Sequence, residues 1–457
     1  MREAVLEGVP AGAGLALLAE LVDEAVWLDP SPLLSHALTA DARWRRIRHE
    51  PPGPPPPRHP GPPPDPDPRR VAVAFAPGPG TPAADHARAW ARAHGYRLLV
   101  PEPAVTAAAD DKIDVLPLLA EAGVPVPEHV IVPATGRLGS AAYWPAGWPR
   151  AVLQRRENHL LGRGTVRVAS RPELSRALCV WEGHELRLSR HVAGLPLTIT
   201  GCAGGDRTVV SAVCHQLVGL PELTPHRGTP CGSQLAGPAD LPPRVHAAAR
   251  EAAYRVGEVL RTRGYRGVFG LDLVTEGSRV LAVGINPRFH TAVSLTHAAE
   301  GAAGLLPVLG LHILAQLLPG LPASRTVHGE LPALSQILVH ARRAAGLGPG
   351  LPGPGRYRLT SEGPLPRPRT AQEDHGPSLT ALAPGEALCW PRVAHGDGPV
   401  RTGDELMLVQ FNSHIVPLVP RPRLSTAGRS WAAGINRALG AESLPAATGG
   451  GGGGSGG

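Results

Sequence analysis

The clearest chemical signal is an acid and an amide near the ends of two successive apolar segments. Asp272 lies in GVFGLDLV, Asn286 lies in RVLAVGINP, and a Glu276-Gly277 turn separates the two segments. A carboxylate inside an apolar strand must be paired or must bind a metal, and Mg²⁺ prefers hard oxygen ligands such as carboxylates and amides. We predict that Asp272 and Asn286 bind Mg²⁺ or Mn²⁺ between adjacent strands, with a structural ion pair as the alternative.

Two cations could act on an anion near this pair. Arg288 follows Asn286 by two residues, and a guanidinium can grip a carboxylate or an acyl phosphate through two parallel hydrogen bonds. Lys112 is the single lysine among 45 basic residues. This uniqueness favours a phosphate-binding role, and the alternative is a solvated residue at the start of a helix.

A glycine pair lies upstream of these residues, in Leu161-Gly162-Arg163-Gly164-Thr165. Glycines let backbone N–H groups approach a triphosphate closely. An isolated pair of this kind more often marks a simple turn. The order of the motifs along the chain therefore has to decide between the two interpretations.

The elements that must position these residues alternate between strands and helices. Ser170 and Glu173 form a capping box at the start of one predicted helix. The predicted helices cover residues 83–93, 110–122, 171–180, 243–262, a helix-rich stretch over 301–318, and 426–439. The predicted strands cover residues 71–75, 96–100, 148–156, 165–168, 185–192, 195–201, 208–219, 267–275, 279–287, 355–360 and 405–419.

Composition divides the chain into four parts. Residues 1–104 form an N-terminal α/β domain, in which 12 prolines make residues 51–68 a semi-rigid linker. Residues 105–323 carry the chemical motifs, and residues 324–446 form a smaller module. Residues 447–457 are a glycine-rich tail without the apolar residues that a core requires.

Charge and cysteine content exclude several classes of protein. The net charge is +7, but the cations are dispersed and aromatic residues make up only 4%, which argues against nucleic-acid binding. No apolar stretch approaches the ~20 residues of a membrane helix, and the N-terminal residues do not resemble a signal peptide. Five cysteines without a C-x-x-C pair favour a reducing cytoplasm.

The order of these motifs resembles the ATP-grasp superfamily over roughly residues 105–320. The segments RHVAGLPLTITG, GYRGVFGLDL and INPRFHTAVSL are more narrowly similar to actinomycete pheganomycin-type peptide ligases. The resemblance implies an α+β ATP-grasp fold, in which two α+β lobes hold ATP between antiparallel sheets. It also implies an N-terminal α/β pre-ATP-grasp domain and a small C-terminal α+β module.

The activity implied by the resemblance is an ATP-dependent carboxylate–amine ligase of specialised metabolism that acts through an acyl phosphate. Its partners are a small-molecule carboxylate and an amine, such as an amino acid or a peptide, and homodimers are common among similar enzymes. The resemblance assigns Asp272 and Asn286 to the metal and Arg288 to catalysis. It assigns nucleotide binding to Lys112, Gln154, Gly162, Gly164, Thr165, His191 and Val192.

Three positions depart from the pattern of the superfamily. Gly284 lies where a metal-bridging glutamate is usual, through replacement or through loss of one residue. Gln154 lies where a second phosphate-binding lysine is typical, and Ser189 or Arg190 replaces an acid near the adenine. A catalytically impaired relative that binds nucleotide or acts as a scaffold therefore stays open as the alternative.

Overall fold

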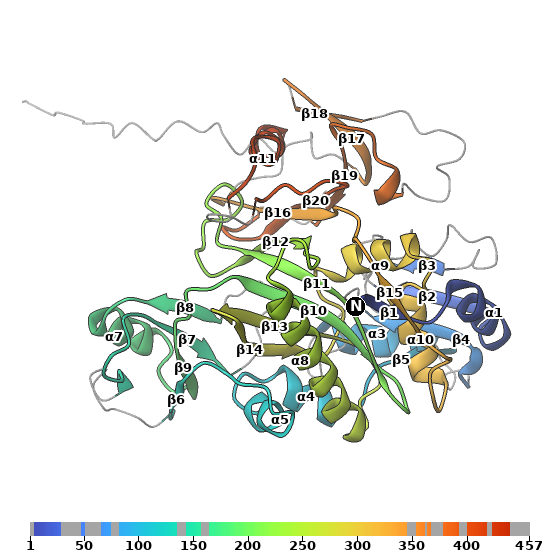
Figure 1. Cartoon of the computed structure of the whole chain (residues 1–457), viewed down its shortest axis with the longest axis horizontal. Coiled ribbons are helices and arrows are strands. Elements are labelled where there is room, and N and C mark those ends of the chain that lie inside the picture. Colours follow the sequence, from blue (N-terminus) through green and yellow to red (C-terminus); the bar gives the residue numbers. More distant parts are fainter. Residues whose placement is uncertain are drawn as a thin grey trace, which may run out of the picture.

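A ten-stranded antiparallel sheet runs through the centre of the molecule (Figure 1). Its strands are β10 (Pro196–Ala203), β11 (Thr208–Val218), β12 (Pro230–Leu235), β13 (Gly267–Glu276), β14 (Arg279–Asn286), β16 (Ser335–His340), β17 (Gly355–Thr360), β18 (Gly363–Pro366), β19 (Glu386–Pro391) and β20 (Glu405–Phe411). They are ordered β14-β13-β10-β11-β12-β16-β20-β19-β17-β18. The computed structural model describes residues 4–28, 47–50, 65–74, 82–134, 143–156, 164–344, 353–361, 363–366, 378–392, 400–417 and 423–438.

A four-stranded antiparallel sheet lies beside β13 and β14, at the left of Figure 1. Its strands, in the order β6-β9-β7-β8, are β6 (His129–Val132), β9 (Leu186–Arg190), β7 (Ala151–Arg155) and β8 (Thr165–Val168). The helix α7 (Arg171–Val180) packs on it through the buried Leu174. Ser170 caps this helix as predicted, since its side chain accepts a hydrogen bond from the Glu173 N–H at 3.3 Å. The Glu173 carboxylate reaches back to the N–H of Ala169, one residue before the expected Ser170.

The N-terminal part is a parallel sheet with helices, as predicted. Its strands, in spatial order, are β3 (Ile47–Glu50), β2 (Glu24–Leu28), β4 (Asp67–Ala74) and β5 (Tyr96–Leu99), accompanied by α1 (Ala11–Leu21) and α3 (Pro82–Ala93). β4 begins at Asp67, inside the predicted linker, and Pro68 is tolerated because it lies at the start of the strand. Residues 51–64 of that linker are outside the described residues.

Helices cover the large sheet and join it to the N-terminal part. α8 (Pro243–Thr262) has the predicted bounds. The stretch predicted as helix-rich forms α9 (Val293–Ala302) and α10 (Val308–Leu317), so the first helix begins earlier than predicted. The segment after residue 102 forms α4 (Pro103–Asp110) and α5 (Val115–Glu121), and not one helix starting at residue 110.

Two contacts fix the N-terminal part against the large sheet. The strand β1 (Ala4–Gly8) forms a separate two-stranded sheet with β15 (Arg325–His328), and its Val5 and Leu6 are buried in one cluster with Ala212 and Cys214 of β11. The Trp27 ring packs edge-on against Phe289, with 5.0 Å between the ring centroids. Because Phe289 immediately follows Arg288, this contact supports the end of the strand that carries the predicted site.

The C-terminal strands continue the large sheet, and α11 (Thr426–Ala438) packs against them. β12 pairs with β16 from Gly232 opposite Ile337 to Gln234 opposite Ser335. β20 ends at Phe411, earlier than the predicted residue 419, and the tail at 447–457 is outside the described residues. None of the helices that the structure describes combines the length and the apolar character needed to cross a membrane.

Candidate functional site

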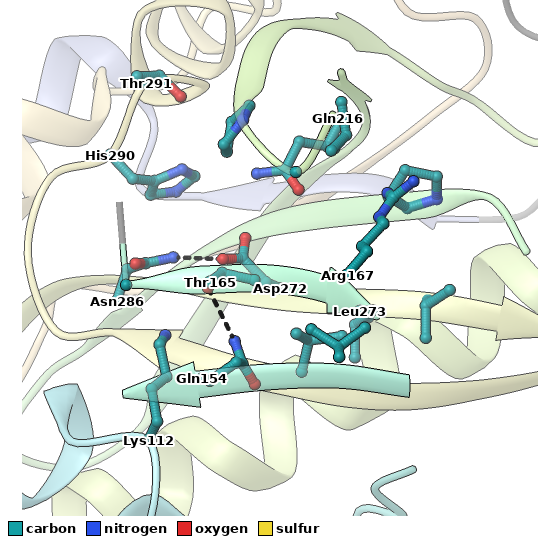
Figure 2. A pocket seen from close by; sticks show the side chains of 18 of the residues that line it. Lys112, Gln154, Thr165, Arg167, Gln216, Asp272, Leu273, Asn286, His290 and Thr291 are labelled. Carbon is teal, nitrogen blue, oxygen red and sulfur yellow. Dashed lines mark hydrogen bonds between the residues drawn. The ribbon is translucent and has the colours of Figure 1, made fainter. Parts of the chain in front are cut away.

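A cavity of about 490 Å³ lies between the two antiparallel sheets (Figure 2). β7, β8 and β9 line one side, β10 to β14 line the other, and residues of β16 and β20 contribute at one end. Of the predicted site residues, those that the structure describes all line this cavity: Lys112, Gln154, Gly164, Thr165, His191, Val192, Asp272, Asn286 and Arg288. Gly162 is outside the described residues.

Asp272 and Asn286 meet on the face of the large sheet that lines the cavity. Asp272 is paired with Gly284, and Asn286 is paired with Gly270, so the acid and the amide are diagonal neighbours on β13 and β14. Asn286 Nδ2 donates a hydrogen bond to Asp272 Oδ2 at 2.9 Å, drawn as a dashed line in Figure 2. The structure therefore brings the two predicted groups together.

The guanidinium of Arg288 contacts the Asp272–Asn286 pair through Asn286. Its Nη2 donates to Asn286 Oδ1 at 3.0 Å, and its Nη1 forms an ion pair with Asp110 Oδ1 at 2.5 Å. Its side chain is only 11% exposed. Asp110 at the end of α4 and Asn286 at the end of β14 thus fix the guanidinium at the wall of the cavity.

The oxygen donors of this pair fit one divalent cation that a phosphate group would share. Mg²⁺ is commonly held by one or two carboxylates together with substrate phosphates and water. Asp272 supplies a carboxylate. Asn286 supplies an amide oxygen once its side-chain amide turns away from Arg288, to which this oxygen is bonded here. No group of three or more His, Cys, Asp or Glu side chains in the described part of the chain could hold a metal ion alone. With one carboxylate and one amide from the protein, a divalent ion at this place would leave coordination positions for phosphate oxygens and water.

The space beside Gly284 is filled by Lys112. A Cβ atom added to Gly284 would lie 2.8 Å from Lys112 Nζ, so the ammonium takes the place where a side chain at this position would begin. Figure 2 shows Lys112 pointing toward Asn286. Burial lowers the pKa of Lys112, whereas the carboxylates of Asp272 and Asp110 raise it.

The small sheet presents a different set of groups to the cavity. Gln154 Nε2 donates to Thr165 Oγ1 at 3.4 Å (Figure 2). Arg187, which was not predicted as a site residue, lies opposite Gln154 in the β7–β9 register and also lines the cavity. One signal in the sequence could have found it, since Arg187 lies between Leu186 and Leu188, which are buried in the lobe core. In a strand, that alternation turns the arginine toward the opposite face.

Histidines line the cavity without carrying charge at neutral pH. His290 lies against Gly270, where an added Cβ atom would come within 2.5 Å of the imidazole ring. Its Nε2 lies 3.1 Å from Thr200 Oγ1, and burial lowers the pKa of His290 to about 4. Burial also lowers the pKa of His191, as do Arg167 and Arg150.

An adjoining cavity of about 630 Å³ shares Thr165 and His191 with the first. Three arginines line it: Arg150, Arg167 and Arg227. Burial lowers the pKa of Arg167, and the two other guanidinium groups lower it further. This side of the site is therefore positively charged and favours anionic ligands.

Comparison with known proteins identifies the fold. No protein-family model matches the sequence, and no curated protein matches it. Carboxyaminoimidazole ribonucleotide synthase from Aspergillus clavatus, solved with ATP, is similar in structure with a TM-score of 0.54 and 13% identity, covering 92% of this chain and 98% of that one. Phosphoribosylamine–glycine ligase from Thermotoga maritima gives a TM-score of 0.52 and 14% identity, covering 90% and 96%. The chain has the ATP-grasp fold.

The ATP-grasp fold confirms the fold class that the sequence predicts. The four-stranded sheet with α7 and the ten-stranded sheet with its helices form the two α+β lobes, and the cavity lies between them. The C-terminal strands are part of the larger sheet of this ATP-grasp fold.

Proposed function

We propose that the protein is an ATP-dependent carboxylate–amine ligase. The observation that carries this proposal is the Asp272–Asn286 pair, hydrogen-bonded at 2.9 Å in an interlobe cavity that Lys112, Arg187 and Arg288 also line. Oxygen donors for a divalent ion and cations for phosphate groups are what a site for a metal-bound triphosphate requires. The solved structure with ATP and the ligase named above, both of the same fold, support the proposal.

In this proposal the nucleotide lies between the lobes. Lys112 neutralises charge on the phosphate chain, and the backbone of Gly164 and Thr165, at the start of β8, covers it. Asp272 and Asn286 hold one divalent ion. When bound, that ion neutralises phosphate charge and polarises the γ-phosphoryl group.

The proposed chemistry has two steps, both governed by position and charge. A substrate carboxylate oxygen attacks the γ-phosphorus, the bond from this phosphorus to the bridging oxygen breaks, and ADP leaves with an acyl phosphate formed. An amine then attacks the acyl carbon, the C–O bond to phosphate breaks, and the nitrogen loses a proton to give the amide. Arg288 stabilises the charge of the acyl phosphate with N–H donors that Asp110 and Asn286 do not use.

For the substrates, we propose an amino acid or peptide as the amine and the specialised metabolism of pheganomycin-type ligases as the setting. We also propose a cytoplasmic protein without nucleic-acid or membrane partners, with a second copy of the chain as a possible partner. All five cysteines lie in the described residues, none forms a disulfide, and four of them are buried. Free buried thiols are typical of a reducing compartment.

A second candidate is a nucleotide-binding protein that does not catalyse ligation. Gly284 favours it, because the carboxylate usual at this position is absent and the Lys112 ammonium fills the adjoining space. One negative charge is therefore missing from the side of the cavity that would hold the metal.

Turnover separates these candidates. The purified chain is incubated with ATP, Mg²⁺ or Mn²⁺ and pooled amino acids and peptides, and ADP release is measured with hydroxylamine added to trap acyl phosphate as a hydroxamate. Release that requires a carboxylate and yields a hydroxamate supports the ligase. A nucleotide-dependent rise in melting temperature without any release supports the second candidate, and no shift at millimolar nucleotide excludes both.

A further inference from the structure

Among the residues that the structure describes, the buried cation Arg187 has no carboxylate partner. Its side chain is among the most deeply buried in the protein, and the residue is 1% exposed. Its hydrogen bonds to protein are two long ones from Nη1, to the backbone oxygens of Lys112 and Val283, each at 3.4 Å. Within the described residues its Nε has no acceptor. A buried charge normally has an ion-pair partner, because desolvation of an uncompensated charge is costly.

Burial is the cause of the lowered pKa of the Arg187 guanidinium. Desolvation lowers the pKa of Arg187 to about 10, with no carboxylate acting against it. Arg187 therefore remains a cation at pH 7. By contrast, Asp110 neutralises Arg288 in the same cavity, and Asp272 and Asp110 both act on Lys112.

The β7–β9 register explains where this charge points. Leu153, Leu186 and Leu188 face the core of the small lobe. Gln154 and Arg187, which are directly paired across the two strands, face the cavity. The Arg187 guanidinium thus reaches from the small sheet toward Val283 on β14, next to Lys112.

We infer that Arg187 binds the phosphate chain of the nucleotide and supplies from β9 the positive charge that its cross-strand partner Gln154 lacks. This inference rests on the proposed nucleotide-binding function and adds a residue to it. An anion between the lobes gives Arg187 the ionic partner that the protein does not provide. Binding would also exchange its two long hydrogen bonds to carbonyl groups for shorter, charge-assisted ones.

Because Arg187 on β9 is directly opposite Gln154 on β7, the inference can be tested by moving the positive charge from residue 187 to residue 154. Arg187→Gln removes the cation, and the double variant Arg187→Gln/Gln154→Lys restores one cation from the neighbouring strand. Arg250→Gln is the matched control, because Arg250 is also largely buried and also donates to backbone oxygens, those of Val5, Val210 and Ser211, but does not line the cavity. Affinity for ATP with Mg²⁺ is measured by titration calorimetry, and the melting temperature of each ligand-free protein is recorded.

We expect Arg187→Gln to weaken ATP binding about ten- to hundredfold, as for loss of a charged hydrogen bond. The double variant should recover most of that loss. The ligand-free melting temperature should stay at or above that of the wild type, because an uncompensated buried charge is removed. Inorganic tripolyphosphate should raise the melting temperature of the wild type but not that of Arg187→Gln. Arg250→Gln should melt lower and bind ATP as the wild type does.

Several results would overturn the inference. Unchanged ATP affinity in Arg187→Gln would leave the proposed function intact and remove Arg187 from the phosphate site. A lower ligand-free melting temperature without recovery by Gln154→Lys would assign Arg187 to structure alone. If Arg187→Gln does not fold, Arg187→Met keeps the length of the side chain without its charge and gives the same readouts. A wild type that binds no nucleotide would overturn the proposed function together with the inference.

Discussion

The two sheets that face the cavity differ in how their charges are balanced. On the large sheet, Asp272 and Asn286 are bonded to each other, and Arg288 has Asp110 as its partner. On the small sheet, the partners of Arg187 within the described ranges are backbone oxygens. The charged groups on the large sheet thus have partners within the protein, whereas the described part of the small sheet offers Arg187 no anionic partner. We conclude that the small lobe depends more strongly on the ligand for its electrostatic balance.

We expect the largest loss of activity from a substitution on the large sheet. Asp272→Asn should abolish ATP turnover, because the carboxylate proposed to bind the divalent ion is replaced by a neutral amide of the same shape. The fold should persist, since the amide can still accept the hydrogen bond from Asn286. ADP release is the measurement, with Glu258→Gln on α8, distant from the cavity, as the control. Retained turnover would remove Asp272 from the metal-binding role.

Acid should destabilise the large lobe more than the small one. Burial lowers the pKa of five histidines of the large lobe, to about 4 for His215, His246, His290 and His312 and to about 3 for His297. Between these values and 6.5 the unfolded chain binds more protons, so stability falls as pH drops from 6.5 toward 4. Each histidine contributes up to about 1.4 kcal/mol per pH unit to this slope.

Urea unfolding followed from pH 7.5 to 4.5 measures this slope. His297→Gln should flatten this slope, because one of the protonation events that destabilise the folded state is lost. A midpoint that does not change between pH 7 and pH 5 would contradict the assignment of these histidines as neutral and buried.

Gly284→Glu tests whether the large sheet can accept another charge. The new side chain must displace Lys112 Nζ, which lies 2.8 Å from the position of its Cβ atom, and it adds a carboxylate beside Asp272. We expect the Mg²⁺ concentration that half-saturates ATP binding to fall about tenfold. Gly284→Ala is the control, since it displaces Lys112 without adding charge. Equal effects of the two variants would show that the displacement alone matters.

The smallest expected effect is a change in the stability of the small lobe. Ser170→Ala removes the hydrogen bond that caps α7 and should lower the free energy of unfolding by about 1 kcal/mol. Ser170→Thr retains a hydroxyl and should stay close to the wild type. Amide hydrogen exchange in α7, with and without ATP, measures the change. If ATP offsets the loss, the dependence of this lobe on its ligand is supported.

The sequence was sufficient to predict that Asp272 and Asn286 lie on neighbouring strands. Their two strands are consecutive and joined by a turn at Glu276-Gly277, so the two residues had to lie near each other. The register shift between Asp272 and Leu273, which puts both side chains on one face, was not predictable from the turn. The bounds of α8 and the N-terminal cap of α7 were also predictable, because helix periodicity and N-terminal capping act within a few residues.

Contacts between distant segments were not predictable in this way. The position of Arg187 opposite Gln154 depends on pairing between β7 and β9, which are separated by the whole of β8 and α7. The contact of Lys112 with Gly284 joins segments that are even further apart. Local alternation fixes the face on which a side chain lies, but tertiary packing decides what lies opposite it.

The pairing of β12 with β16 has a consequence for how the protein can be divided. If the chain were cut before β16, the N–H and C=O groups along one side of β12 would be left without their partners. An open edge of this kind is a template for association with other chains. The shortened protein should therefore aggregate, and the C-terminal strands protect the two lobes from such association.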